Sequence, residues 1–438
     1  MAPDTTWSLH HLELENFRQY EHFEIDLDER LTVLVGKNGS GKSAILDATS
    51  IALGSVLAGF GGKAPGIAAS DARVTTAVGD AVRVSTTAAH YPVSITAAGR
   101  LAGRAQTWTR TRNAKSGRTT WGDNGIREVV KDLADDARSA RGDDVVLPVI
   151  AYYGIERLVG VRKLTGHLSL SERSSAYENA LDPKSDMHRL QGYVSLLAQA
   201  AYQQHTRTGA DDSMAARQLA AISLACDRAL GSSGWHAMSW DPVLKEITLE
   251  SEAGLRLPLS SLSSGIRIIA GLVIDIASRM GRANPTLGDE DLLARAPGIV
   301  LIDEVDLHLH PTWQQQVVTT LRQTFPAIQL IVSTHSPQTL SALPASSIRI
   351  LTEEGVRQPE FAEGLGPEVI LESIQETNPV PLTPTKERLH EYLELVIDKG
   401  EGESPRARRL REELDEKTGG AQNVPQLADA DAFMTFSL

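Results

Sequence analysis

A phosphate-binding loop is the feature of this sequence that most restricts its fold. Residues 36–43 read G-K-N-G-S-G-K-S, which fills every fixed position of the pattern G-x-x-x-x-G-K-[S/T]. The apolar, β-branched run at residues 31–35 predicts a buried strand before the loop, and the residues after it are compatible with a helix. Backbone N–H groups can surround a phosphate in this strand, loop, helix context. The alternative, a Gly-rich turn with a chance lysine, fits that context poorly.

The motif assigns expected roles to individual residues. Lys42 is expected to reach the β and γ phosphates of ATP, and Ser43 to ligate Mg²⁺. The residues expected to hold nucleotide here are Gly36, Lys37, Asn38, Gly39, Ser40, Gly41, Lys42, Ser43 and Ala44.

Composition indicates a soluble globular protein of two or three structural units. The chain has 438 residues, of which 41% are apolar and 23% charged. A net charge of −13 excludes a polycation built to coat nucleic acid, although a local basic patch can still bind phosphates. The single cysteine, Cys226, fits a reducing compartment. Residues 1–10 lack the apolar core of a signal peptide and residues 44–60 are interrupted by Asp47, so we expect a cytoplasmic protein without membrane contact.

Two later strands end in side chains that a nucleotide site needs. Residues 298–304 form an apolar run ending in Asp303, expected to hold Mg²⁺ through its water shell, and Glu304, expected to face the water that attacks the γ phosphate. Residues 329–335 form another apolar run ending in His335, which could hydrogen-bond the γ phosphate. Either run alone could be a strand that simply stops at solvent.

A short motif, L-S-S-G at residues 262–265, begins an apolar helix. Ser264 and Gly265 would present a hydroxyl and backbone amides at the helix N-terminus, which suits a γ phosphate. Taken alone, the motif is better explained by a serine that caps the helix.

The order of these motifs resembles the ATP-binding-cassette arrangement. In that family the signature helix of one subunit closes over nucleotide held by another, so the resemblance implies a homodimer with two sandwiched ATP molecules. It also implies an α/β fold: a two-lobed head with a mixed sheet and an antiparallel β lobe. Four regions are expected: the first part of the head (1–165), a helical insertion leading to the signature (166–255), the rest of the head (256–365) and a C-terminal helical region for assembly or partner binding (366–438).

Two further resemblances narrow the class. Residues 12–20, L-E-L-E-N-F-R-Q-Y, are similar to the start of RecF and SMC-type ATPases, which implies that Arg18 packs near the nucleotide. The segment D-E-V-D-L-H-L-H-P at 303–311, and residues 147–154 with Arg157, resemble bacterial defence ATPases of the overcoming-lysogenization class and the Septu (PtuA-like) and retron-associated group. The chain departs from the cassette pattern in its L-S-S-G signature and in lacking a clear Q-loop glutamine, for which Gln106 is a weak candidate.

Two other groups of residues admit alternatives. Asp306, His308 and His310 could hold a metal, but no further ligand is evident and the motif resemblance already accounts for them. Residues 100–118, expected to include a hairpin centred on 113–117, hold six basic residues and no acid. They could contact a DNA backbone or protect an exposed sheet edge, and the sequence does not separate these interpretations.

The sequence thus supports two functional hypotheses. The first is an ATP-hydrolysing dimer switch in a bacterial anti-phage complex that regulates a partner effector such as an HNH-type nuclease, because no second catalytic motif is recognisable. The second is a DNA-repair or chromosome-maintenance ATPase that binds DNA directly.

Overall fold

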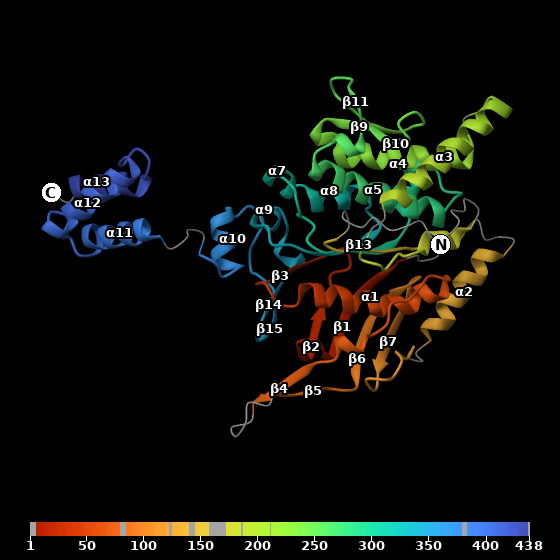
Figure 1. Ribbon diagram of the computed structural model, residues 1–438, viewed down its shortest axis with the longest axis horizontal. Coiled ribbons are helices and arrows are strands. Elements are labelled where there is room, and N and C mark those ends of the chain that lie inside the picture. The colour runs from red at the N-terminus through yellow and green to blue at the C-terminus, as the bar shows by residue number, and fades with distance from the viewer. Residues whose placement is uncertain are drawn as a thin grey trace. The chain divides into compact units, whose positions relative to one another are not determined.

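The fold was analysed in a computed structural model that describes residues 6–78, 85–121, 125–139, 145–156, 172–184, 187–210, 212–378 and 383–436. Its centre is a mixed six-stranded sheet in the order β15-β14-β3-β13-β12-β8 (Figure 1). The strands are β3 (Leu31–Val35), β8 (Val149–Tyr153), β12 (Gly298–Ile302), β13 (Ile328–Ser333), β14 (Ile348–Thr352) and β15 (Gly355–Arg357). All pair in parallel except β15, which is antiparallel to β14. Every residue of β3, β8, β12 and β13 is buried, as their continuous apolar sequences predict.

An antiparallel sheet, ordered β2-β1-β6-β7, forms the second layer. Its strands are β1 (Ser8–Phe17), β2 (Tyr20–Asp26), β6 (Val93–Leu101) and β7 (Arg104–Arg112), and a separate ribbon pairs β4 (Val74–Val78) with β5 (Ser85–Ala89). Burial alternates along β6, so one face of this sheet joins the core. The predicted hairpin centred on 113–117 is confirmed only as a turn: the Thr120 N–H donates to the Thr111 carbonyl at 2.8 Å, but residues 118–121 form no strand. The main hairpin joins β6 to β7 through the turn at Ala102–Gly103.

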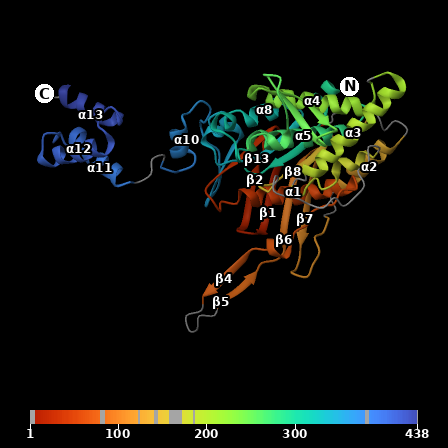
Figure 2. The same ribbon diagram turned by 45° about the horizontal axis from the view of Figure 1, so that its top comes forward.

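Helix α1 (Lys42–Gly59) lies between the two sheets, as two views of the ribbon show (Figures 1 and 2). It contacts β6 and β7 on one side and β8, β12 and β13 on the other, with α2 (Ile126–Arg138) alongside. Almost all of α1 is buried, which explains why its sequence is apolar around the whole helix.

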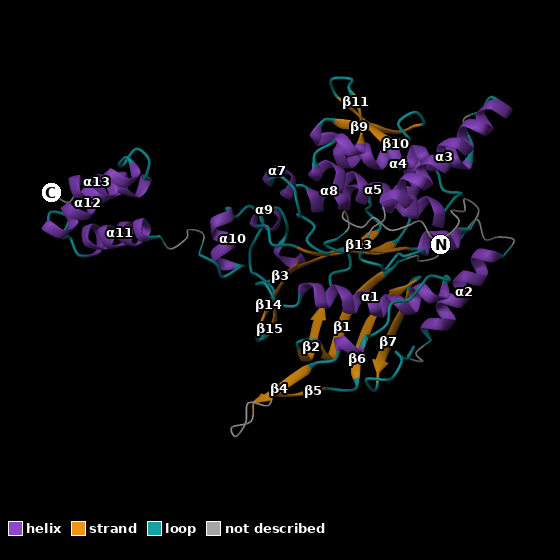
Figure 3. Ribbon diagram, in the orientation of Figure 1, coloured by secondary structure: helices purple, strands orange, loops and turns teal. Residues whose placement is uncertain are grey.

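The opposite face of the central sheet is covered by a helical layer. It contains α3 (Met187–Thr208), α4 (Met214–Leu230), α5 (Ser264–Ala283) and α6 (Asp289–Arg295), and α4 also packs on a three-stranded sheet of β9 (Trp235–Asp241), β10 (Glu246–Ser251) and β11 (Arg256–Pro258) (Figure 3). The helical spacing at 187–230 and 264–280 correctly predicted α3, α4 and α5. Shorter helices follow: α7 (Pro311–Gln314), α8 (Val317–Thr324), α9 (Pro337–Leu340) and α10 (Pro367–Ser373).

Residues 371–438 form a second compact unit. Its helices are α11 (Pro384–Leu393), which continues into a π-helical turn at Glu394–Asp398, α12 (Pro405–Thr418) and α13 (Pro425–Phe436). They enclose a core of their own around Tyr392, Leu410 and Leu427. The sequence predicted the first two of these helices. The α/β class, with its mixed sheet, antiparallel lobe, helical insertion and helical extension, is confirmed.

Candidate functional site

The phosphate loop joins β3 to α1 in a conformation that requires glycine. Gly39 and Gly41 have φ values of 83° and 96°, in the left-handed region that side chains rarely adopt. A Cβ on Gly41 would come within 2.0 Å of the Tyr20 hydroxyl, which donates a hydrogen bond to the Ser40 carbonyl. The loop backbone is therefore packed tightly from β2, and this contact positions the first turn of α1.

The lysine of the loop is held by the loop's own backbone. The ammonium of Lys42 donates to the carbonyls of Gly36 (2.8 Å) and Lys37 (3.2 Å). Burial lowers the pKa of Lys42, while Asp303 and Glu304 act in the opposite direction. Within the described residues, the buried hydroxyl of Ser40 has no hydrogen-bond partner. An orphaned hydroxyl beside a buried lysine at a helix N-terminus fits a bound phosphate group.

The strand end of β12 brings Asp303 directly to the loop. The Ser43 hydroxyl donates to Asp303 Oδ2 at 2.7 Å, although the two residues are 260 positions apart in sequence. Both are oxygen ligands of the kind Mg²⁺ prefers, and Mg²⁺ commonly keeps waters between itself and a carboxylate. The pair therefore fits a Mg²⁺ site, provided that the direct Ser43–Asp303 hydrogen bond gives way when the ion enters.

Ser333, which the sequence analysis missed, holds both acidic residues. Its hydroxyl donates to Asp303 Oδ1 and accepts the backbone N–H of Glu304 at 2.8 Å. Glu304 has a φ of 48°, an uncommon conformation for a non-glycine residue that its surroundings must hold in place. The only sequence signal for Ser333 was a hydroxyl at the end of an otherwise apolar strand.

His335 follows β13 and lies at the same end of the central sheet. Burial, followed by the charge of Lys42, lowers the pKa of His335, and Glu304, Asp306 and Asp303 oppose this shift. The charges of the phosphate-loop lysine and of the acidic residues therefore both act on the pKa of His335. Next to it, the Thr334 hydroxyl donates to Asp306, which orders the segment after Glu304.

The L-S-S-G motif lies where helix α5 begins. Ser263 is the capping residue, since its hydroxyl accepts the backbone N–H of Ile266 at 3.4 Å. Ser264 is thereby left as an exposed residue of the first turn. A Cβ on Gly265 would meet the His308 carbonyl at 3.2 Å and the Leu309 side chain at 3.4 Å. The start of α5 thus packs against the segment that follows Glu304.

Arg18 is oriented by two carboxylates. Its guanidinium donates to Asp47 at 2.7 Å and to Asp71 at 3.1 Å. Burial alone would lower the pKa of Arg18, but the two carboxylates outweigh it and raise the pKa. Asp47 lies one helical turn after Ser43 and also accepts the hydroxyl of Tyr152 at 2.8 Å. Arg18 therefore contacts the helix that follows the phosphate loop, and any contact with nucleotide stays a prediction.

The basic segment 100–118 is only partly a surface feature. Arg110 is 2% exposed and donates to the carbonyls of Ile51 (2.7 Å) and Pro65 (2.6 Å). Burial lowers the pKa of Arg110 to about 10. Arg112 donates to the carbonyls of Ile67 and Lys115. The exposed basic residues are Arg100, Arg104, Lys115 and Arg118. Arg110 is therefore taken up by the interior of the fold, and a DNA contact through the rest of the segment stays a prediction.

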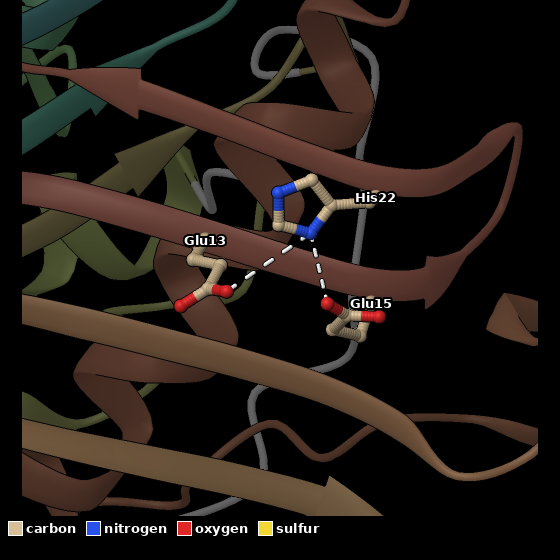
Figure 4. A group of neighbouring side chains, drawn as sticks. All are labelled: Glu13, Glu15 and His22. Carbon is tan, nitrogen blue, oxygen red and sulfur yellow. Dashed lines mark hydrogen bonds and ion pairs between the residues drawn. The ribbon is translucent and has the colours of Figure 1, made fainter.

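Asp306, His308 and His310 are not brought together as metal ligands in the described part of the chain. The ring of His310 instead accepts the Thr312 N–H as the cap of α7. Among the described residues, the one group with suitable spacing is Glu13, Glu15 and His22, on strands β1 and β2 (Figure 4). There His22 pairs with Glu15 at 2.8 Å, and this hydrogen bond raises the pKa of His22. This hydrogen bond already occupies one ligand atom of the imidazole and one of Glu15.

Two residues singled out in the sequence stay without a role. Gln106 lies on β7 opposite Gly99, in the antiparallel sheet. The strand beside β12 is β8, so Gln106 is not on the strand next to the one that leads to Asp303. Arg157 lies outside the described residues. The tyrosines of β8 lie in the 147–154 motif, but the sequence analysis gave them no role.

Comparison with known families decides the class. Residues 11–208 match a family model described as "AAA domain". Residues 122–341, half of the chain, match one described as "AAA domain, putative AbiEii toxin, Type IV TA system". The chain belongs to this AAA family. No helix in the described part of this chain is long and apolar enough to cross a membrane.

Several known proteins are similar to parts of this chain. The retron Vc95 probable ATPase of Vibrio cholerae is 46% identical over 23% of this chain and 19% of its own length. The retron Ec83 probable ATPase of Escherichia coli is 37% identical over 32% of this chain and 26% of its own length. The Septu protein PtuA of Bacillus mycoides is 36% identical over 24% of this chain and 14% of its own length. These matches confirm the resemblance to defence-associated ATPases, and they span about a quarter or less of each relative.

Among solved structures, the SMC head domain from Thermotoga maritima matches 81% of this chain and 100% of its own length. The TM-score is 0.44 and the sequence identity is 17%.

Proposed function

We propose that this chain is an ATP-binding and ATP-hydrolysing dimer switch of a bacterial anti-phage defence complex. Two copies would enclose two Mg-ATP molecules, each held by the phosphate loop of one subunit and the signature helix of the other. Hydrolysis would then open the dimer and change the state of a partner effector.

The observation that carries this proposal is the placement of α1 and α5 on opposite faces of the central sheet (Figure 1). Two consecutive residues of β8 locate both helices, since Tyr152 contacts Asp47 of α1 and Tyr153 contacts Asp275 of α5. Successive side chains of a strand point to opposite faces of its sheet. The exposed Ser264 therefore starts a helix on the far side of the sheet from α1. A second copy of the chain can bring its signature to this phosphate loop without refolding either element.

Within one half-site, the proposed chemistry follows from the hydrogen bonds. Lys42 exchanges its carbonyl partners for the β and γ phosphates, and the Ser40 hydroxyl gains an acceptor. Mg²⁺ held by Ser43 and Asp303 would neutralise phosphate charge. Glu304, fixed through its backbone by Ser333, would orient the attacking water. His335 would then donate a hydrogen bond to the γ phosphate.

The place in defence is proposed from the similarity to a retron probable ATPase and to a Septu protein. We infer a separate effector, such as an HNH-type nuclease, and a cytoplasmic location in keeping with the buried thiol of Cys226. Direct DNA binding by a repair-type ATPase is the alternative. It is favoured by the exposed Lys115 and Arg118, and weakened because Arg110 is used inside the fold.

Substitution of Lys42 and Glu304 tests the proposed activity. Lys42→Ala should abolish binding of a fluorescent ATP analogue, because the loop loses its only buried ammonium among the described residues. Glu304→Gln should bind the analogue normally and lower the rate of ATP turnover by about 100-fold or more, because the attacking water loses its carboxylate. Phosphate release measured on purified protein gives the rate. Turnover by Glu304→Gln at the wild-type rate would show that another residue orients the water.

A further inference from the structure

Tyr153 contacts both halves of the proposed composite site. It ends β8, and its backbone carbonyl accepts the N–H of Asp303 at 2.8 Å. Its hydroxyl donates to Asp275 Oδ2 of the signature helix at 2.7 Å. One buried residue therefore links the backbone of the expected Mg²⁺ carboxylate to the helix whose first turn carries Ser264.

The link on the helix side is tightly held. Asp275 also accepts from Arg279 at 2.8 Å, and Arg279 donates to the carbonyls of Ala176 and Glu178. Burial, and then the Asp275 carboxylate, raise the pKa of Tyr153 well above its ordinary value, so the hydroxyl stays protonated and donates. A hydrogen bond to a buried carboxylate that is already paired is among the stronger kinds in proteins.

Binding of Mg²⁺ would change the contacts of Asp303. Ser43 and Asp303 are joined by a direct hydrogen bond, which Mg²⁺ coordinated by Ser43 must replace. Asp303 is hydrogen-bonded to Tyr153, and Tyr153 is hydrogen-bonded to Asp275. A shift of the Asp303 backbone would therefore move α5. Side chains in a packed interior leave little slack to absorb such a shift.

We propose that Tyr153 and Asp275 are positioning residues that couple Mg-ATP binding in one subunit to the orientation of the signature helix that this subunit offers to its partner. This inference rests on the proposed dimer and adds its regulation: a subunit presents a competent signature only when its own site is loaded. The two nucleotide sites of a dimer would consequently be filled together.

The test uses Tyr153→Phe in full-length protein that also carries Glu304→Gln, so that bound ATP is not consumed. Tyr177→Phe is the matched control, because it removes another buried tyrosine hydroxyl, one that donates to the Pro148 carbonyl at 2.9 Å and not to α5. Binding of a fluorescent ATP analogue and ATP-dependent dimerisation by sedimentation velocity are measured for each. Thermal unfolding fixes a temperature at which all variants are folded.

We expect Tyr153→Phe to bind the analogue with an affinity within about twofold of its parent, since Lys42 and Ser43 are unchanged. It should need about tenfold more ATP for half-maximal dimerisation, because one hydrogen bond to a charged group is lost. Tyr177→Phe should match the parent in both measurements. Unchanged dimerisation of Tyr153→Phe would overturn the coupling and leave the dimer intact. A parent that stays monomeric with ATP would instead overturn the proposed function itself.

Discussion

At the scale of single residues, the nucleotide site is built from contacts between positions far apart in sequence. Ser43 and Asp303 meet through a hydrogen bond, and Ser333 fixes the backbone of Glu304. The motifs singled out Ser43, Asp303 and Glu304 as candidate ligands, because each motif is local. They did not predict a role for Ser333, because that role depends on β12 and β13 being neighbours in the sheet.

His335 yields a prediction about pH. Burial and Lys42 lower its pKa in the nucleotide-free protein, so its folded form binds fewer protons than an ordinary histidine below about pH 6.5. Stability should therefore decline as the pH falls below that value. A γ phosphate would favour the imidazolium and raise the pKa, so ATP binding should take up a proton near pH 6.5.

Calorimetry of Mg-ATP binding in two buffers with different heats of ionisation measures this proton. His335→Gln and Mg-ADP are the controls, and both should show less proton uptake than wild-type protein with Mg-ATP. Equal proton uptake in wild type and His335→Gln would remove His335 from the γ-phosphate contact.

At the scale of elements, hydrophobic periodicity predicted the strands and helices that carry the site, including β3, β12, β13 and α5. In the basic segment it predicted the turn at 113–117 but missed the main hairpin. That hairpin joins β6 to β7 across the shorter turn at Ala102–Gly103. Local turn propensity could not reveal that pairing. For the same reason the sequence could not show that Arg110 points inward to α1.

The inward position of Arg110 predicts a structural defect on its removal. Arg110→Ala leaves the carbonyls of Ile51 and Pro65 without their donor and should lower the free energy of unfolding by about 2–3 kcal/mol. The exposed Arg118→Ala should change it by less than about 0.5 kcal/mol. Urea denaturation followed by circular dichroism measures both. If Arg110→Ala were as stable as wild type and only weakened DNA binding, Arg110 would belong to a nucleic-acid surface after all.

At the scale of the whole molecule, the chain divides into the ATPase unit, residues 1–370, and a helical unit, residues 371–438. The helical unit has its own core, centred on Tyr392 and Leu410. Amphipathic patterns near 386–397 and 405–417 predicted α11 and α12, whereas α13 lacks such a pattern and was missed. The larger unit carries the phosphate loop at the start of α1 and the L-S-S-G motif at the start of α5, and these two helices lie on opposite faces of its sheet. Our account therefore makes a second copy of the chain a requirement for turnover.

Mixing two inactive variants tests this requirement most directly. Glu304→Gln blocks hydrolysis but keeps nucleotide binding and the signature, and Ser264→Arg blocks the signature but keeps the phosphate loop and Glu304. Each alone should lose ATP turnover, whereas an equal mixture should recover about a quarter of the wild-type rate, since half of the dimers are mixed and each has one complete site. A mixture as inactive as its components, or full turnover by Ser264→Arg alone, would contradict a site shared between subunits.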